Sequence, residues 1–222
     1  DIIYRASRME NGIVFDYQAR YCKIGSLDRP NAELWFVLHG YGQLAPYFVK
    51  KFQFLEEKGH CIIAPEGLNR FYLKGFNGRV GATWMTKEDR LRDIDNYINY
   101  LDAVYRKEVG NRQDLVVNLL GFSQGSATIS RWIAQGEVQY RRLFIWAGVI
   151  PEDLNFESDR SNFQEKSIYL VYGTNDPFIT KGRLAGHFKI SQQLGIRPEV
   201  VEFDGEHDID AVTLNEILAN DQ

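Results

Sequence analysis

The stretch DLVVNLLGFSQGSATISRWIAQG, residues 114–136, contains a strand, a tight turn and a helix in succession. Its first part (114–121) is an apolar run of the length of one buried strand. Its last part (124–136) is typical of a helix that ends at a glycine. The turn between them, GFSQG (121–125), fits the pattern G-x-S-x-G. So short a pattern also fits an ordinary structural turn, and its surroundings must decide between the two.

The same alternation of short apolar runs and longer amphipathic stretches extends along most of the chain. It is repeated about five times, which predicts an α/β fold with a mostly parallel sheet and helices on both faces. We expect strands at 33–40, 60–67, 114–121, 142–148, 167–173 and 198–203, and helices at 46–59, 124–136, 180–194 and 209–220, with a further helix that starts near Thr86 and has an apolar face to Val104.

The length of 222 residues indicates a single domain spanning residues 1–222. Within it we expect N-terminal antiparallel strands in residues 1–30, where the segment 13–24 alternates between polar and apolar residues, and a core in residues 31–222. Residues 67–85 contain several glycines and are predicted to form a long loop. The chain leaves little room for a separate lid domain.

Composition excludes several classes of function. The formal net charge is −4 and no basic block stands out, so we expect no nucleic-acid partner. No apolar run reaches the length of a membrane span, and residues 1–10 show no signal-peptide pattern. We therefore expect a cytoplasmic protein, although the chain starts at Asp1 and a removed leader stays open. Cys22 and Cys61 lie in no metal-binding spacing, so no metal or cofactor is expected.

In parallel sheets, catalytic groups gather in the loops that follow the strands. Ser123 meets this criterion, because it lies between an apolar strand and a helix. The flanking glycines permit a sharp turn, and the helix N-terminus offers N–H groups to a developing negative charge. A serine hydroxyl also needs a base, and histidine suits that role near neutral pH.

Four histidines are present, and in this type of fold the acid and then the histidine follow the serine along the chain. His207 lies in the loop after the last predicted strand, whereas His187 lies inside a predicted helix and is the weaker candidate. Asp176 follows the strand 167–173 and is the preferred acid. Asp204 also follows a strand and stays open as the alternative.

The sequence VLHGYGQ (37–43) supplies a loop after an earlier strand, in which glycines flank Tyr41. Acyl transfer needs two N–H donors for the oxyanion. We expect these from the backbone of Tyr41 and of Gln124, which directly follows the serine. His39, in the same loop, is expected to brace it.

With these elements in place, the chain resembles the phospholipase/carboxylesterase family of α/β-hydrolases, which includes acyl-protein thioesterases. The matching motifs are LHGYG (38–42), GFSQG (121–125), GTNDPF (173–178) and GEH (205–207), and the resemblance spans about residues 33–220. It implies a catalytic triad of Ser123, Asp176 and His207 and an oxyanion hole formed by the N–H groups of Tyr41 and Gln124.

The chain also departs from the family pattern. Gln43, Leu44 and Ala45 stand where the family has an Asp, Ser126 replaces a glycine, and Tyr172 replaces a histidine before the acid motif. None of these residues belongs to the expected reacting groups. Together they indicate a divergent branch with its own substrate.

The expected activity is hydrolysis of a small carboxylic ester or thioester through an acyl-enzyme. We expect Trp84 and Phe178 to contact the substrate, Trp84 because the resembling family places an aromatic near its acyl site. Packing of the loop is an equally good explanation of Trp84. Other hypotheses are a peptidase, a polyester or carbohydrate-ester hydrolase, or an inactive binding protein of the same fold. A homodimer is left open.

Overall fold

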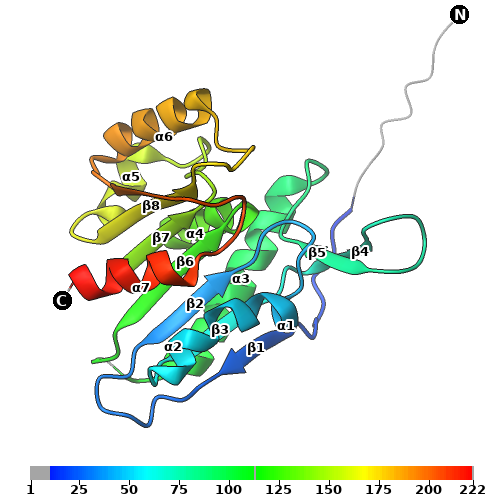
Figure 1. Cartoon of the computed structure of the whole chain (residues 1–222). Coiled ribbons are helices and arrows are strands. Elements are labelled where there is room, and N and C mark those ends of the chain that lie inside the picture. The colour runs from blue at the N-terminus through cyan, green and yellow to red at the C-terminus, as the bar shows by residue number, and fades with distance from the viewer. Residues whose placement is uncertain (1–10, 113, 222) are drawn as a thin grey trace, which may run out of the picture.

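A computed structural model describes residues 11–112 and 114–221, so the opening stretch in which no signal peptide was found lies outside it. Seven strands form the central sheet in the order β1-β3-β2-β6-β7-β8-β9 (Figure 1). All neighbouring pairs are parallel except β1 with β3. The mostly parallel α/β sheet expected from the sequence is thereby confirmed.

The five inner strands lie close to their predicted positions because each is a largely apolar run that is buried on both faces, whereas the edge strands β1 and β9 are partly exposed. The seven strands are β1 (Tyr21–Ile24), β2 (Leu34–Leu38), β3 (Cys61–Pro65), β6 (Val117–Phe122), β7 (Arg142–Trp146), β8 (Ser167–Gly173) and β9 (Glu199–Phe203).

Helices cover both faces of this sheet. One face is covered by α1 (Ala45–Phe48), the 3-10 helix η1 (Val49–Phe52), α2 (Gln53–Glu57) and α7 (Ala211–Asn220). The other is covered by α3 (Arg90–Val109), α4 (Gln124–Gln135), α5 (Phe156–Phe163) and α6 (Lys181–Leu194). The predicted helix 46–59 is thus a chain of three short helices, and Figure 1 shows the two layers.

The N-terminal segment contains less strand than its alternating pattern suggested. Only Tyr21–Ile24 pairs, antiparallel to β3, and residues 11–20 lie outside any strand. Ile13 and Val14 are 87% and 99% exposed, so their apolar side chains pack against nothing in the described chain. A two-residue period predicts a strand only where a partner edge is available.

The predicted loop 67–85 contains a second, two-stranded sheet, which corrects the sequence-based expectation. β4 (Asn69–Tyr72) pairs antiparallel with β5 (Val80–Thr83), and the hairpin projects from the body of the molecule (Figure 1). Its glycines mark the hairpin end: Gly75 and Gly78 have φ of 60° and 89°. The helix after it begins at Arg90 rather than near Thr86, because Asp89 at its N-cap is left-handed, with φ of 48°.

The parallel strands end at one edge of the sheet, and the loops that leave this edge carry the candidate residues. Tyr41 follows β2, Ser123 follows β6, Asp176 follows β8 and His207 follows β9. The topology therefore brings together residues that lie up to 166 positions apart in sequence. Within residues 11–112 and 114–221, the helices are too short or too polar to cross a membrane.

Candidate active site

Ser123 lies in a strained turn between β6 and α4. Its backbone has φ of 54° and ψ of −114°, a conformation that residues other than glycine rarely adopt. Its N–H donates to the Trp146 carbonyl at 2.9 Å. A Cβ at Gly121 would lie 2.4 Å from the Gly125 carbonyl oxygen, and one at Gly125 would lie 2.2 Å from that of Leu38. Both glycines are therefore required by close packing of the turn.

Ser126, which replaces a glycine of the resembling family, is accommodated in the buried base of this turn. Its hydroxyl donates to the Gly121 carbonyl at 2.6 Å and is completely buried. The space for it comes from Gly148, where a Cβ would lie 2.3 Å from the Ser126 Oγ. The serine side chain thus contributes a hydrogen bond beneath the turn.

His207 and Asp176 form a hydrogen-bonded pair. The distance between His207 Nδ1 and Asp176 Oδ2 is 2.7 Å, and the Asp176 side chain is fully buried. The other carboxylate oxygen accepts from the Phe178 N–H at 2.8 Å, which fixes the carboxylate plane. Asp176 can therefore set the tautomer and the orientation of the imidazole.

The imidazole of His207 contacts two aromatic rings. The His207 ring centroid lies 4.9 Å from that of Phe122, the residue before Ser123, and 4.7 Å from that of Phe178. Among the described residues, Ser123 and His207 share no hydrogen bond, and such contacts are often longer before substrate binds. Phe178 is about half exposed, so its ring covers the imidazole and faces solvent.

The rival candidates occupy different surroundings. His187 is buried in α6, and neither of its ring nitrogens has a hydrogen-bond partner among the described residues. Burial lowers the pKa of His187 to about 4. Asp204 is exposed and accepts from the Asn175 side chain at 3.1 Å. The structure therefore pairs His207 with Asp176 and keeps both rivals out of that contact.

The loop after β2 presents the expected oxyanion donor. Gly42 N–H donates to the Ala82 carbonyl at 2.8 Å, and Gly40 N–H donates to the Gln43 side chain at 2.8 Å. The N–H groups of Tyr41 and Gln124 donate no hydrogen bond within the described part of the chain. Both are thus free to bind a negatively charged oxygen.

His39 braces this loop, as its position suggested. Its Nε2 accepts from the Gly67 N–H at 2.9 Å, and its ring stacks on Trp84 at a centroid distance of 5.0 Å. Burial lowers the pKa of His39 to about 4, so the ring is neutral at pH 7. The Trp84 indole donates to the His39 carbonyl at 2.9 Å and is only 1% exposed. Trp84 therefore packs behind the loop, which is the second of the two explanations that the sequence left open.

The side chain of Gln124 has a role that the sequence did not reveal. Its amide nitrogen donates to the Thr83 hydroxyl and the Met85 carbonyl, and its amide oxygen accepts from the Trp84 N–H. These contacts attach the residue after Ser123 to the segment that follows the β4–β5 hairpin. The side chain of Gln124 therefore helps to fix the residue that follows Ser123.

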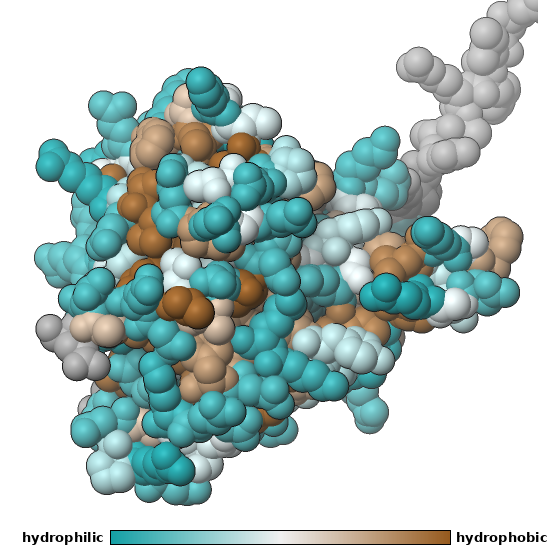
Figure 2. Space-filling view, viewed as in Figure 1, coloured by the Kyte–Doolittle hydropathy of each residue, from teal (hydrophilic) through white to brown (hydrophobic). Residues whose placement is uncertain are grey.

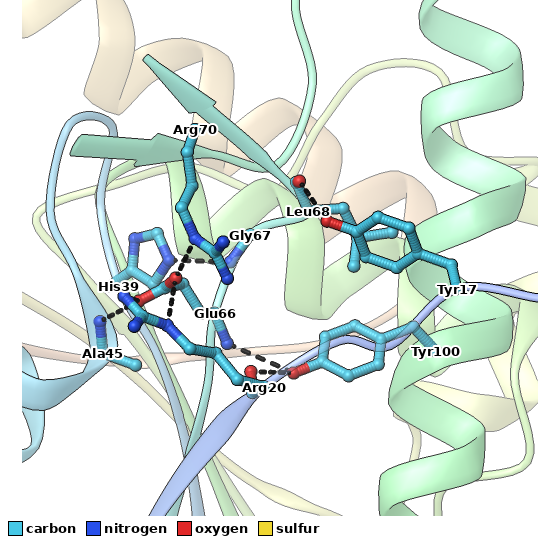
Figure 3. A network of polar contacts seen from close by, with 9 residues as sticks. All are labelled: Tyr17, Arg20, His39, Ala45, Glu66, Gly67, Leu68, Arg70 and Tyr100. Carbon is cyan, nitrogen blue, oxygen red and sulfur yellow. Dashed lines mark hydrogen bonds and ion pairs between the residues drawn. The ribbon is translucent and has the colours of Figure 1, made fainter. Parts of the chain in front are cut away.

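The buried Glu66, which directly follows β3, is the centre of a polar network beside the loop 39–44, called here the oxyanion loop after its expected role (Figure 3). Its carboxylate accepts from Arg20 and from Arg70, both at 2.7 Å, and from the Ala45 N–H at 3.1 Å. Burial alone would raise the pKa of Glu66, but hydrogen bonds from Arg20, Arg70 and Ala45 outweigh it and the net pKa is lowered. Figure 3 also shows His39 and Gly67 beside this network.

A groove of about 550 Å³ borders the oxyanion loop. Its lining includes Gly42, Leu44 and Tyr47 on one side and Arg79 on the hairpin. Lys51 lies at its margin and pairs with Asp208, the neighbour of His207, at 2.6 Å. The hairpin carries apolar side chains outward, as Figure 2 shows, and Phe76 is 95% exposed. A larger hollow of about 780 Å³ lies at the opposite edge of the sheet, beside Val117.

Comparison with known proteins places this arrangement in context. The model of the family described as Phospholipase/Carboxylesterase matches residues 19–219. No curated protein sequence matches the chain. Among solved structures, esterase PE8 is 19% identical and has a TM-score of 0.67, with 92% of this chain and 98% of that chain covered. Zea mays acyl-protein thioesterase 2 is 14% identical and has a TM-score of 0.67, with 91% and 97% covered.

Proposed function

The chain belongs to the phospholipase/carboxylesterase family of α/β-hydrolases, and from this premise we propose that it hydrolyses small acyl esters or thioesters through a serine triad. Membership of the family makes it a hydrolase of ester bonds. The triad, the acyl-enzyme and the substrate are the proposed part. The observation that carries the proposal is the 2.7 Å contact between His207 Nδ1 and buried Asp176, next to the strained turn of Ser123.

In the first half of the proposed reaction, His207 Nε2 takes the proton of the Ser123 hydroxyl as Oγ attacks the carbonyl carbon. The carbonyl oxygen becomes negative and binds the N–H groups of Tyr41 and Gln124. Each such donor is typically worth a factor of about 10²–10³ in kcat. The imidazolium then gives its proton to the leaving alcohol or thiol, and the acyl group stays on Ser123.

In the second half, water attacks the acyl-enzyme. His207 accepts the water proton and gives it to Ser123 Oγ as the acid leaves, which restores the Ser123 hydroxyl for the next cycle. Asp176 stays ionised throughout and stabilises the imidazolium through Nδ1. No residue outside the triad has to change its charge in this cycle.

The substrate site is proposed to include Phe178 and the groove beside the oxyanion loop. Phe178 covers the imidazole, and the groove volume of about 550 Å³ lies within the range of small-molecule pockets. Leu44 and Tyr47 offer apolar contact to a short chain, while Arg79 can approach a polar leaving group. Trp84 is 1% exposed, so we assign it to packing behind the loop and not to the substrate site.

A hydrolysis panel tests the proposal. Acyl esters and acyl thioesters of graded chain length are compared on the wild-type protein and on Ser123→Ala. We expect turnover of short chains by the wild-type protein and none above background by the variant. Turnover that persists unchanged in Ser123→Ala would refute the serine mechanism, and no turnover of any ester would leave the inactive binding protein as the better explanation.

A further inference from the structure

Trp146, the last residue of β7, is buried and makes contacts on both sides of the candidate triad. Its carbonyl oxygen accepts from the Ser123 N–H at 2.9 Å. Its indole Nε1 donates to the Asp208 carbonyl at 2.9 Å, and Asp208 directly follows His207. Trp146 is completely buried. Its main chain is thus hydrogen-bonded to the turn 121–125 that contains Ser123 (the serine turn), and its side chain to the loop 204–210 that contains His207 (the histidine loop).

The position of β7 in the sheet explains this double contact. Trp146 is in register with Phe122 of β6 and with Val171 of β8. It therefore lies between the strand that leads to Ser123 and the strand that leads to Asp176. Its side chain belongs to the core on the α7 face, which is the side from which the loop 204–210 returns to the helix.

Apart from the Asp176 contact on the His207 ring, the other attachments of the histidine loop are more exposed or more distant. Lys51 pairs with the Asp208 carboxylate, but that carboxylate is 58% exposed and solvent screens the pair. Asn175 N–H donates to the Gly205 carbonyl, two residues before His207. The Trp146 indole is a buried side chain that donates to the main chain of this loop at Asp208, the residue after His207.

We propose that Trp146 is a positioning residue that holds the serine turn and the histidine loop at a fixed separation through its carbonyl and its indole N–H. This inference rests on the proposed triad. Reacting groups must be aligned closely, and a displacement of about 1 Å can cost up to about 10²-fold in rate. The proposal therefore predicts a loss in kcat with little change in KM when the indole N–H is removed.

Trp146→Phe removes the indole N–H, and Trp132→Phe is the matched control. Trp132 is also completely buried and also donates from its indole, to Asp102 at 2.7 Å, but from within α4 and away from the histidine loop. As a second variant, 3-benzothienylalanine at position 146 keeps the shape of tryptophan and replaces the N–H by sulfur. This isostere keeps the test valid where the smaller Phe would unfold the core.

Two measurements are made on all proteins: steady-state hydrolysis and hydrogen exchange of the segment 204–210. For both position-146 variants we expect kcat to fall about tenfold, KM to stay within about twofold and the segment to exchange faster. Trp132→Phe should lower the melting temperature comparably and leave kcat and exchange of this segment unchanged.

The proposal is overturned if kcat and exchange in the position-146 variants match the wild-type values, or if Trp132→Phe loses as much kcat. A loss of kcat without faster exchange also contradicts it, because the effect would then lie outside the loop. If the wild-type protein hydrolyses no ester, the proposed function fails on its own, and exchange of residues 204–210 alone decides whether Trp146 holds the loop.

Discussion

The two sides of the candidate active site are held in different ways. The oxyanion side is tied by many contacts: His39 to Gly67, Gly42 to Ala82, and Ala45 to the Glu66 carboxylate. On the histidine side, the contacts at His207 and Asp208 that involve a buried side chain are those of Asp176 with the ring and of Trp146 with the loop, and further contacts lie at exposed or more distant positions. The difference suggests that single changes on the oxyanion side affect stability more than rate, whereas single changes on the histidine side affect rate directly.

The largest expected effect concerns the residue between these two sides. Ser123→Ala should lower kcat by about 10⁵-fold or more, as loss of a serine nucleophile does elsewhere. Ser123→Gly should be equally inactive but more stable than Ser123→Ala, since glycine tolerates φ of 54°. Steady-state kinetics and urea unfolding of the two variants check both statements. Equal stability of Ala and Gly here would contradict the strained turn.

On the histidine side, Asp176→Asn should lower kcat by about 10³–10⁴-fold, because the amide stabilises the wrong imidazole tautomer. Asp204→Asn is the matched control, since Asp204 also follows a strand but is exposed and bonded to Asn175. We expect kcat within about threefold of wild type for the control. The opposite ranking would make Asp204 the acid and would break the assignment of this side.

On the oxyanion side, Glu66→Gln should destabilise the fold by about 1–3 kcal/mol. This is less than the usual cost of breaking a buried ion pair, because Arg20 and Arg70 are partly exposed and solvent screens their charges. The kcat of the variant should stay within about threefold, because His39 and Ala82 still hold the loop. Urea unfolding and kinetics at pH 7 separate the two quantities. A collapse of kcat in a folded Glu66→Gln protein would show that the oxyanion side is no better supported than the histidine side.

Glu66 also sets a direction for acid sensitivity. Its pKa is lowered in the folded protein, so the stabilisation it gives is complete above its unfolded pKa of about 4.3 and is lost as pH falls through the lower folded value. The wild-type protein should therefore lose more stability on acidification in this range than Glu66→Gln does. The comparison needs only melting temperatures measured from pH 5 to pH 3.

The smallest effect on activity is expected for His187, which lies in α6 and outside both sides of the site. The pKa of His187 is about 4 in the folded protein, so between pH 6.5 and pH 4 the unfolded chain binds a proton that the folded chain does not. His187→Leu should remove about 2 kcal/mol of the stability loss between pH 7 and pH 5 and leave kcat unchanged. Equal pH dependence of wild type and variant would mean that His187 is protonated in the fold.

Much of this structure could be predicted from local sequence. The inner strands are largely apolar runs whose positions follow from burial, and Ser123 and Asp176 each follow one of them, whereas His207 follows the partly exposed edge strand β9. The β4–β5 hairpin was missed because both strands have only four residues, β4 is largely exposed, and neither shows a clear two-residue period. The N-terminal pattern was right only for residues 21–24, which pair antiparallel with β3, and over-predicted strand before them, where the alternation has no partner strand.

The supporting contacts could not be predicted because they join distant segments. Trp146 is an apolar residue in an apolar strand, and nothing local indicates that its indole faces Asp208, 62 positions away. Trp84 lies in a loop rich in glycine and aromatics, yet its stacking on His39 buries it. The side-chain contacts of Gln124 likewise depend on where the hairpin returns to the sheet.

The central claim is that Ser123 is a nucleophile activated by His207 and Asp176. Intact-mass and peptide mass spectrometry after treatment with a fluorophosphonate test it most directly. We predict one adduct per chain in the wild-type protein, located on Ser123, no adduct in Ser123→Ala and much slower labelling of Asp176→Asn. Absence of an adduct in the folded wild-type protein, or an adduct on another residue, would contradict the claim.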